Sequence, residues 1–194
     1  MITILQFHCC FIRSGGFASI GLPDLTSTTS AYLPLSATAV KREIYEAYVG
    51  SEDYDRFRHV NTFGGNPAAC ALALKNLEIM ENENLVERSR VLGERLLEEL
   101  AELTEHPNVG DVRGKGLLVG IELVRDKTTK EPAPVEQVNK VVSLCREKGL
   151  LIGKNGDTVA GYNNILQLSP PLSITEDDFY FIVKCLKESI LNFN

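Results

Sequence analysis

The stretch His59-Val-Asn-Thr-Phe-Gly-Gly-Asn-Pro-Ala-Ala-Cys70 marks the point where the chain passes from a tight loop into a helix. Two glycines precede Asn66 and Pro67, and small and apolar residues follow at helical density. Asparagine here can accept hydrogen bonds from the free N–H groups of a first helical turn, and proline fits the first helical position, where no N–H is needed. The pattern predicts a capped helix that begins at Pro67.

The same loop can also be interpreted as an anion site. A helix N-terminus presents unpaired N–H donors and the positive end of the helix dipole, and both suit a phosphate group. Thr62 adds a hydroxyl at the entrance to the loop. Local chemistry leaves both interpretations open: a capped helix after a flexible turn, or a phosphate-binding loop.

The composition excludes several classes of function. The chain has 194 residues, of which 44% are apolar and 24% charged, as in a soluble globular protein with a buried core. Its net charge of −6 argues against a nucleic-acid partner, because no basic face is available to neutralise phosphates. The apolar residues 1–12 are too short to span a membrane and lack the features of a signal peptide. Five cysteines without a Cys-x-x-Cys pair indicate reduced thiols in the cytoplasm and no metal site.

Hydrophobic periodicity predicts a helical middle and a mixed C-terminal part. Helices are expected from Pro67 to about Met80, from Leu85 to about Leu103, from Val135 to Lys148, and after a cap at Thr175-Glu-Asp-Asp178. Strands are expected at Val109–Arg113, Leu117–Val124, Leu150–Ile152 and Asn164–Leu168, the first two forming a hairpin around Gly114-Lys-Gly116. The charged face of the second helix is interpreted as solvated. Arg113 is interpreted as a structural arginine tied to nearby carboxylates or carbonyls.

Four motifs resemble, in order, those of class III aminotransferases, which are dimeric fold-type-I enzymes that use pyridoxal 5'-phosphate (PLP). They are Tyr32–Tyr45, Thr62–Pro67, Val112–Leu123 and Leu168–Leu172. The resemblance covers roughly residues 24–194. It implies an α/β fold, the C-terminal part of a PLP-transferase of fold type I. The implied organisation is a partial large domain with a remnant of its sheet at 1–65, linking helices at 66–104 and a small α+β domain at 105–194.

The resemblance implies one cofactor-binding residue. In the family, the threonine that matches Thr62 bonds the phosphate of the PLP bound in the other subunit of the dimer. The Schiff-base lysine has no counterpart, because aligning Thr29-Ser-Ala-Tyr32 with the family places Thr26 at its position. No lysine stands anywhere between Met1 and Val40. Threonine can neither form an imine nor act as the base at neutral pH.

A second family feature is also missing near the start of the chain. Phe11-Ile-Arg-Ser-Gly15 resembles a family stretch preceded by Asp-Glu-Val, whose aspartate pairs with the pyridine nitrogen of PLP. In that register Leu5-Gln-Phe7 stands in its place. Lys41, the nearest amine, falls at a peripheral position. We therefore assign no catalytic residue and no metal ligand, and we expect no covalent attachment of PLP to this chain.

Gln167 bears on the choice of substrate. Some family members place an arginine two residues before the Ser/Ala-Pro-Pro motif, where it binds a substrate α-carboxylate. Glutamine cannot supply that charged fork. The resemblance is therefore to the ω-amino-acid or amine:pyruvate branch.

Three hypotheses follow. The first is an active class III aminotransferase that moves an amino group from an amine or ω-amino acid to a 2-oxo acid; the missing lysine and aspartate argue against it. The second, which we prefer, is a truncated cytoplasmic form that lacks the Schiff-base lysine and is inactive alone. The third is a non-catalytic dimerisation or binding module that completes the PLP phosphate site of an intact homologue. We expect a homodimer or such a mixed pair, with no nucleic-acid or membrane partner.

Overall fold

A computed structural model describes residues 32–33, 42, 46–52, 66–156 and 159–191, which fall into two compact units divided between Glu83 and Asn84. The first unit contains helix α2 (Pro67–Asn82). Its buried side chains, Ala69 and Ala73, pack with Leu33 and the partly buried Cys70. The predicted helix beginning at Pro67 is confirmed.

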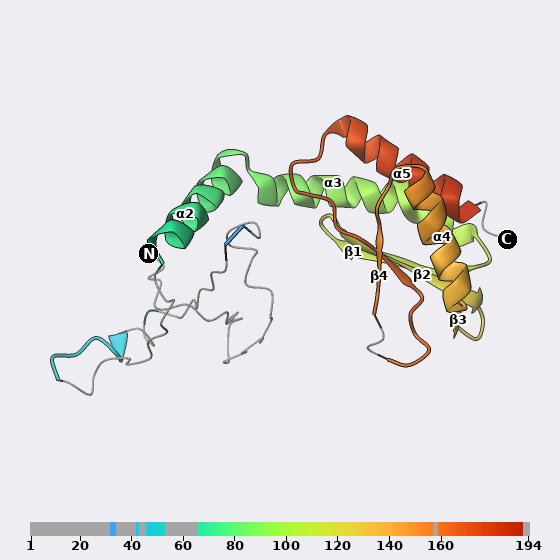
Figure 1. Cartoon of the computed structure of the whole chain (residues 1–194), viewed down its shortest axis with the longest axis horizontal. Helices are drawn as coiled ribbons and strands as arrows, with labels where there is room; N and C mark the ends of the chain where they lie inside the picture. The colour runs from blue at the N-terminus through green and yellow to red at the C-terminus, as the bar shows by residue number, and fades with distance from the viewer. Residues whose placement is uncertain (1–31, 34–41, 43–45, 53–65, 157–158, 192–194) are drawn as a thin grey trace. The chain divides into compact units, whose positions relative to one another are not determined.

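The second unit is an antiparallel sheet packed against three helices (Figure 1). The sheet order is β1-β2-β5-β4, with β3 paired to β2. The strands are β1 (Val109–Lys115), β2 (Leu118–Asp126), β3 (Glu131–Pro132), β4 (Gly153–Lys154) and β5 (Ile165–Leu168). The helices are α3 (Leu85–Leu100), the 3-10 turn η3 (Ala101–Glu105), α4 (Val135–Glu147) and α5 (Glu176–Leu191). This α+β unit confirms the expected fold class of the C-terminal part.

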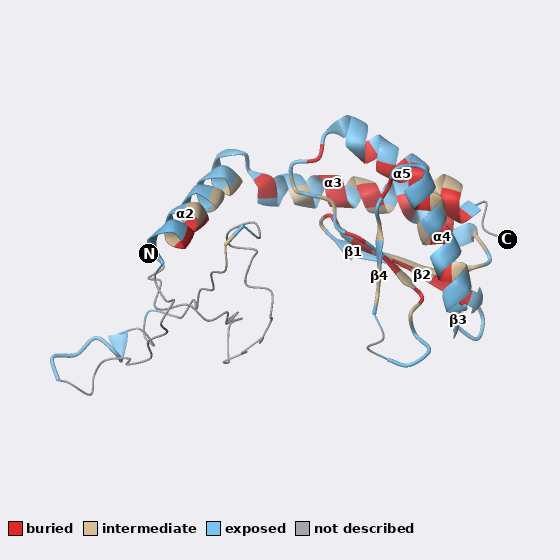
Figure 2. Cartoon of the chain, in the orientation of Figure 1, coloured by how far each residue is buried: buried red, intermediate tan, exposed pale blue. Residues whose placement is uncertain are grey.

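The two faces of the sheet differ because alternate strand residues point to opposite sides. On the core face, the sheet contributes buried aliphatic side chains that pack with the inner sides of α3, α4 and α5 (Figure 2). The other face, called the open face below, carries half-buried and exposed residues. The strand pairing places these in register across three strands: Arg113, Gly120, Glu122, Ile165 and Gln167. Helix α3 contributes side chains to the hydrophobic core on the opposite face of the sheet.

The predicted hairpin is present, with longer strands than expected. Strands β1 and β2 pair in register from Asp111 opposite Glu122 to Lys115 opposite Leu118. Gly116 in the turn has φ +55°, a left-handed conformation that glycine adopts without steric cost. The Gly114-Lys-Gly116 segment is thus a turn between strands, as predicted.

The predicted strand Leu150–Ile152 is wrong. Leu150 belongs to the end of α4, where its N–H donates to the Cys145 carbonyl and the Gly149 N–H donates to the Arg146 carbonyl. Gly149 has φ +91°, so these bonds form a Schellman motif, which commonly buries the residue after the glycine. Leu151 is 77% exposed, and the strand begins only at Gly153. A short apolar run is compatible with a helix C-cap as well as with a strand.

The start of α5 forms the predicted capping box. The Thr175 hydroxyl accepts from the Asp178 N–H at 3.1 Å, and the Asp178 carboxylate accepts from the Thr175 N–H at 3.0 Å. The Asp178 carboxylate also accepts from the Thr175 hydroxyl at 2.7 Å, and this bond, together with the bond from the Thr175 N–H, lowers the pKa of Asp178. The charged face of α3 is exposed, as expected, apart from the half-buried Arg95. Arg95 forms a bidentate ion pair with Glu176 at 2.9 and 3.0 Å. This pair joins α3 to the first turn of α5.

Candidate functional site

The first turn of α2 is capped from within. The Asn66 side-chain oxygen accepts from the N–H groups of Ala68 at 3.0 Å and Ala69 at 3.2 Å, as the sequence predicts. The Cys70 N–H donates to the Asn66 carbonyl, and Pro67 has no N–H. The expectation of free donors for a phosphate is therefore wrong for residues 67–70. These residues do not fit a PLP phosphate, and we derive no step through the cofactor from them.

The site residues implied by the family resemblance fall outside the described residues. These are Thr62, the implied phosphate contact, and Thr26, at the position of the Schiff-base lysine. Lys41 and the stretch Leu5-Gln-Phe7 fall outside as well. The structure therefore does not test these assignments, and their roles stay predictions.

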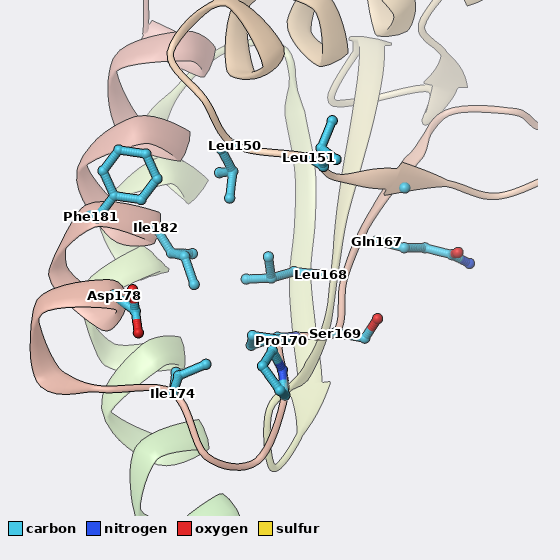
Figure 3. Close-up of a pocket in the computed structure, with 12 residues that line it drawn as sticks. Leu150, Leu151, Gln167, Leu168, Ser169, Pro170, Ile174, Asp178, Phe181 and Ile182 are labelled. Atoms are coloured by element: carbon cyan, nitrogen blue, oxygen red, sulfur yellow. The ribbon is translucent and has the colours of Figure 1, made fainter. Parts of the chain in front are cut away.

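Gln167 and the Ser-Pro-Pro segment that follows lie at the end of β5. Figure 3 shows Leu168 pointing toward Ile182 of α5, whereas Gln167 and Ser169 point away from that helix. This alternation is the two-residue period of a strand. It places Leu168 in the core, where it is 5% exposed, and leaves Gln167 and Ser169 exposed. The residue that the family resemblance connects with the substrate is therefore accessible within its unit.

A groove of about 430 Å³ runs between this segment and α5 (Figure 3). Its apolar lining includes Leu151, which is 77% exposed, and Phe181, which is 45% exposed. The polar lining groups are Gln167, Ser169 and Asp178. The carboxylate of Asp178 is already used in the α5 cap. The described lining contains no lysine, arginine or histidine, so it provides neither a charged fork for a carboxylate nor a proton-transfer base.

Arg113 has the structural role that was predicted for it. Its guanidinium donates from Nη1 to Glu122 Oε2 at 2.8 Å and to Asp111 Oδ2 at 2.9 Å, all three residues standing on the open face. These hydrogen bonds raise the pKa of Arg113 above its ordinary value. The sequence motif around Arg113 thus forms a charged cluster of one guanidinium and two carboxylates on the sheet surface.

The described residues were compared with the requirements of metal binding, thiol reactivity and membrane insertion. Among them, no group of three or more histidine, cysteine or acidic residues is arranged to hold a metal ion. Cys145 and Cys185 are free and buried, and burial raises the pKa of both thiols. None of the described helices has the length and apolar character needed to span a bilayer.

A comparison with models of protein families identifies the family of this chain. The family model described as "Aminotransferase class-III" matches residues 22–190. The chain belongs to the class III aminotransferase family. PLP is the cofactor of this family, in agreement with the resemblance stated above. The sequence motifs from Tyr32 onward all fall within the matched range.

Individual aminotransferases give the same result. The chain is 67% identical over 189 residues to the uncharacterized aminotransferase YhxA of Bacillus subtilis, covering 93% of this chain and 42% of that protein. It is 42% identical over 194 residues to the taurine–pyruvate aminotransferase of Bilophila wadsworthia, covering 94% and 42%. The chain thus spans less than half the length of these relatives.

Solved structures show the same partial correspondence. The crystal structure of a Bacillus anthracis aminotransferase matches with a TM-score of 0.77 and 65% identity, covering 84% of this chain and 37% of that one. A PLP-bound amine transaminase from an uncultivated Pseudomonas species matches with a TM-score of 0.74 and 34% identity, covering 86% and 37%. The fold is therefore that of part of a PLP-dependent aminotransferase.

Proposed function

We propose that this chain serves class III transamination, the transfer of an amino group from an amine or ω-amino acid to a 2-oxo acid, and that it does not perform the reaction alone. The proposal that the chain is inactive alone is supported by the absence of any lysine between Met1 and Val40. The family resemblance assigns Thr26 to the Schiff-base position. PLP supplies the electron sink of such reactions when it is held by a lysine. We infer that the chain acts in the cytoplasm, which agrees with the buried, unpaired thiols of Cys145 and Cys185.

Gln167 supports an amine or ω-amino acid as the donor. Its amide is neutral and exposed, and none of the described residues that line the adjacent groove is cationic. A substrate α-carboxylate would therefore lack the bidentate cation that it binds best. The 42% identity to a taurine–pyruvate aminotransferase and the 34% identity to an amine transaminase agree with this choice.

A second candidate function is a non-catalytic module that pairs with an intact homologue, or with a second copy of this chain. Helix α2 favours it, because this helix buries only alanines in its own unit and exposes Leu74, Leu77 and Ile79 by 64%, 41% and 38%. Exposed aliphatic residues of this kind mark contact surfaces. In such a pair, Thr62 of this chain would contact the phosphate of PLP held by the intact partner.

Borohydride trapping tests whether the chain is inactive alone. Purified chain is mixed with PLP and treated with borohydride, and tryptic peptides are searched for a reduced lysine adduct. We expect no adduct at one specific lysine. A stoichiometric adduct at a single lysine, together with transaminase activity of the chain alone, would contradict the proposal.

Complementation tests the pairing. An intact relative whose own Thr62-equivalent is replaced by alanine is co-expressed with this chain, and the mixed complex is purified and assayed. We expect restored PLP retention and activity with the chain as it stands and with Thr62→Ser, but no restoration with Thr62→Ala. Equal restoration by all three chains, or no complex at all, would rule out this module.

A further inference from the structure

Strand β1 lies at the end of the sheet order, so only its β2 side is paired in the part of the chain that the structure describes. Successive residues of a strand direct their N–H and carbonyl groups to opposite neighbours. The Leu123 N–H donates to the carbonyl of the residue before β5, so Glu122 directs its groups to β1, where it pairs with Asp111. Val112 and Gly114 therefore direct their N–H and carbonyl groups away from β2, and no described residue bonds to these groups.

The free edge of β1 is confined to its second half. Gly110 is the extra residue of a bulge at the start of the strand, and the Lys130 ammonium donates to the Gly110 carbonyl at 2.7 Å. A bulge and a lysine are devices that close an edge to further strands. At the other end, the strand stops at Lys115. The stretch Asp111–Lys115 is thus the part of the edge that another strand can reach.

The open-face side chains of this stretch carry unbalanced charge. Asp111 and Glu122 share the single guanidinium of Arg113, which leaves one negative charge in excess. Lys115 lies two residues beyond Arg113 on the same face and is exposed, and its ammonium has no hydrogen bond or ion pair with a described residue. Along the strand, Lys115 and Asp111 are about 13 Å apart, too far for an ion pair. One chain therefore presents an unpaired cation and an excess carboxylate along the same edge.

Helix α3 does not supply the missing carboxylate. Arg90 and Glu94 line a groove of about 450 Å³ together with Lys115. The Arg90 guanidinium pairs with Glu94 at 2.7 Å and with Glu87 at 2.6 Å, so these carboxylates are already engaged. The Lys115 ammonium is therefore available to a carboxylate of another molecule.

We propose that β1 is a self-association edge, which pairs antiparallel with β1 of a second copy of this chain. The register sets Val112 opposite Gly114 of the second copy, so that the two exchange their outward N–H and carbonyl groups. Lys115 then lies opposite Asp111 of the second copy, and two-fold symmetry forms this pair twice. The two copies of Arg113 meet on the symmetry axis, each already paired with two carboxylates. This inference rests on the proposed function only in choosing a second copy as the partner.

The charges select this register over its neighbours. Charges of unlike sign directly opposite one another stabilise a strand pair, whereas like charges destabilise it. A shift that sets Gly114 opposite Gly114 would place Arg113 opposite Lys115. A shift that sets Val112 opposite Val112 would overlap only residues 111–113 of the free edge and leave Lys115 without a carboxylate. An antiparallel second copy is thus a strand whose charges complement those of β1.

Sedimentation velocity of the full chain over a concentration series tests the pairing. We expect a monomer–dimer equilibrium whose dissociation constant rises at least severalfold in Lys115→Glu and in Asp111→Lys, because each variant sets like charges opposite one another twice. The double variant Asp111→Lys/Lys115→Glu exchanges the signs and should restore the affinity, although it too lacks the bond between Asp111 and Arg113. Lys184→Glu makes the same charge change at an exposed site on α5 and, as the matched control, should leave the affinity unchanged.

Three results of this series would overturn the inference. The first is a chain that stays monomeric at every concentration. The second is association that is equal in all variants, as expected if the exposed aliphatic residues of α2 form the contact instead. The third is a double variant that associates as weakly as the single ones, because the charges would then act within one chain rather than between two.

Disulfide trapping tests the register independently of these charges. In this register the two copies of residue 113 form a non-hydrogen-bonded pair, with Cα atoms about 4.5 Å apart and within reach of a disulfide. Arg113→Cys is treated with oxidised glutathione, which takes up the two electrons and two protons of the thiol pair, and peptide mass spectrometry should find residue 113 linked to residue 113. Asp111→Cys is the matched control on the same face, because its two copies would lie about 13 Å apart. Equal linkage in both variants, or none in Arg113→Cys, would overturn the register.

Failure here is separable from failure of the proposed function. Sedimentation and disulfide trapping involve neither PLP nor an intact homologue. If the chain associates through β1 but the Thr62 complementation experiment finds no complex, the proposed function fails alone. If complementation succeeds while Lys115→Glu leaves self-association unchanged, this inference fails alone.

Discussion

Gly93, in the middle of α3, lies against the backbone of Gly116 in the β1–β2 turn. A Cβ built on Gly93 would be 2.2 Å from the Gly116 carbonyl oxygen. The turn is also held from α3 by the Ser89 hydroxyl, which accepts from the Leu117 N–H at 3.3 Å. Helix and hairpin therefore approach at backbone contact distance. This contact fixes the end of the sheet against the helix.

Gly93→Ala should destabilise the protein by about 1–3 kcal/mol, the usual cost of inserting atoms into a packed contact. The backbone of Gly116 cannot rotate away as a flexible side chain could. Urea unfolding measures the change. Gly156→Ala is the matched control, because a Cβ there meets nothing within 4 Å. If Gly93→Ala lowers the free energy of unfolding no more than the control does, α3 can shift away from the turn at little cost.

Asn66→Ala should remove the hydrogen bonds that cap the first turn of α2. The Asn66 side-chain oxygen holds the N–H groups of Ala68 and Ala69, and loss of such a cap costs about 0.5–2 kcal/mol. Hydrogen exchange by NMR should show faster exchange at these two amides. Asn66→Asp, which keeps an acceptor oxygen, should retain their protection. Unchanged exchange in the alanine variant would mean that other groups protect the turn.

His106 should make stability depend on pH. Burial and the nearby Lys127 hold the pKa of His106 below its usual range, and its Nδ1 accepts from the Asn108 N–H at 3.2 Å. The unfolded chain therefore takes up a proton before the folded one does. The free energy of unfolding should fall as the pH drops below about 6.5, the ordinary histidine value, until the folded-state pKa is passed.

His106→Gln should reduce this slope. Urea unfolding of both proteins at intervals between pH 7.5 and 5 isolates the contribution of His106 as a difference, at about the pH range where histidine titrates. A difference that is constant across this range would exclude a role for His106 titration. The difference, wild type minus variant, should grow as the pH rises, and a difference that falls as the pH rises would mean the opposite sign of the pKa shift.

The Arg113–Glu122 pair should contribute little to stability. The Arg113 side chain is 49% exposed and that of Glu122 is 25% exposed. Partly exposed ion pairs of this kind typically contribute about 0–1 kcal/mol. A double-mutant cycle with Arg113→Gln and Glu122→Gln should give a coupling in this range that shrinks in high salt. A much larger, salt-independent coupling would contradict this assignment.

Cys145 and Cys185 should be inert in the folded protein. Both thiols are buried, at 0% and 4% exposure, and burial raises their pKa, so little thiolate is available to react. Iodoacetamide labelling followed by peptide mapping should modify the partly exposed Cys70 before Cys145 and Cys185. Labelling of the two buried thiols should accelerate with urea in step with global unfolding. Fast labelling in the native state would show local opening between α4 and α5.

Much of this protein was predictable from short stretches of sequence. The caps at Asn66 and Thr175 and the β1–β2 hairpin depend on residues within a few positions of one another, so local chemistry specifies them. For Arg113 the sequence predicted only that nearby carboxylates or carbonyls bind the guanidinium, and the structure identifies the partners as Asp111 and Glu122. The strand predicted at Leu150–Ile152 failed because an apolar run does not distinguish a strand from the buried end of a helix C-cap.

The sequence by itself determined the family, the cap of α2 and the absence of any lysine between Met1 and Val40. Only the tertiary structure decided that Gly93 meets Gly116 and that glycines flank Gln167. Both contacts depend on which residues of distant segments come together. Strand register and helix packing set these contacts, and both are settled by the burial of the whole core rather than by any local pattern.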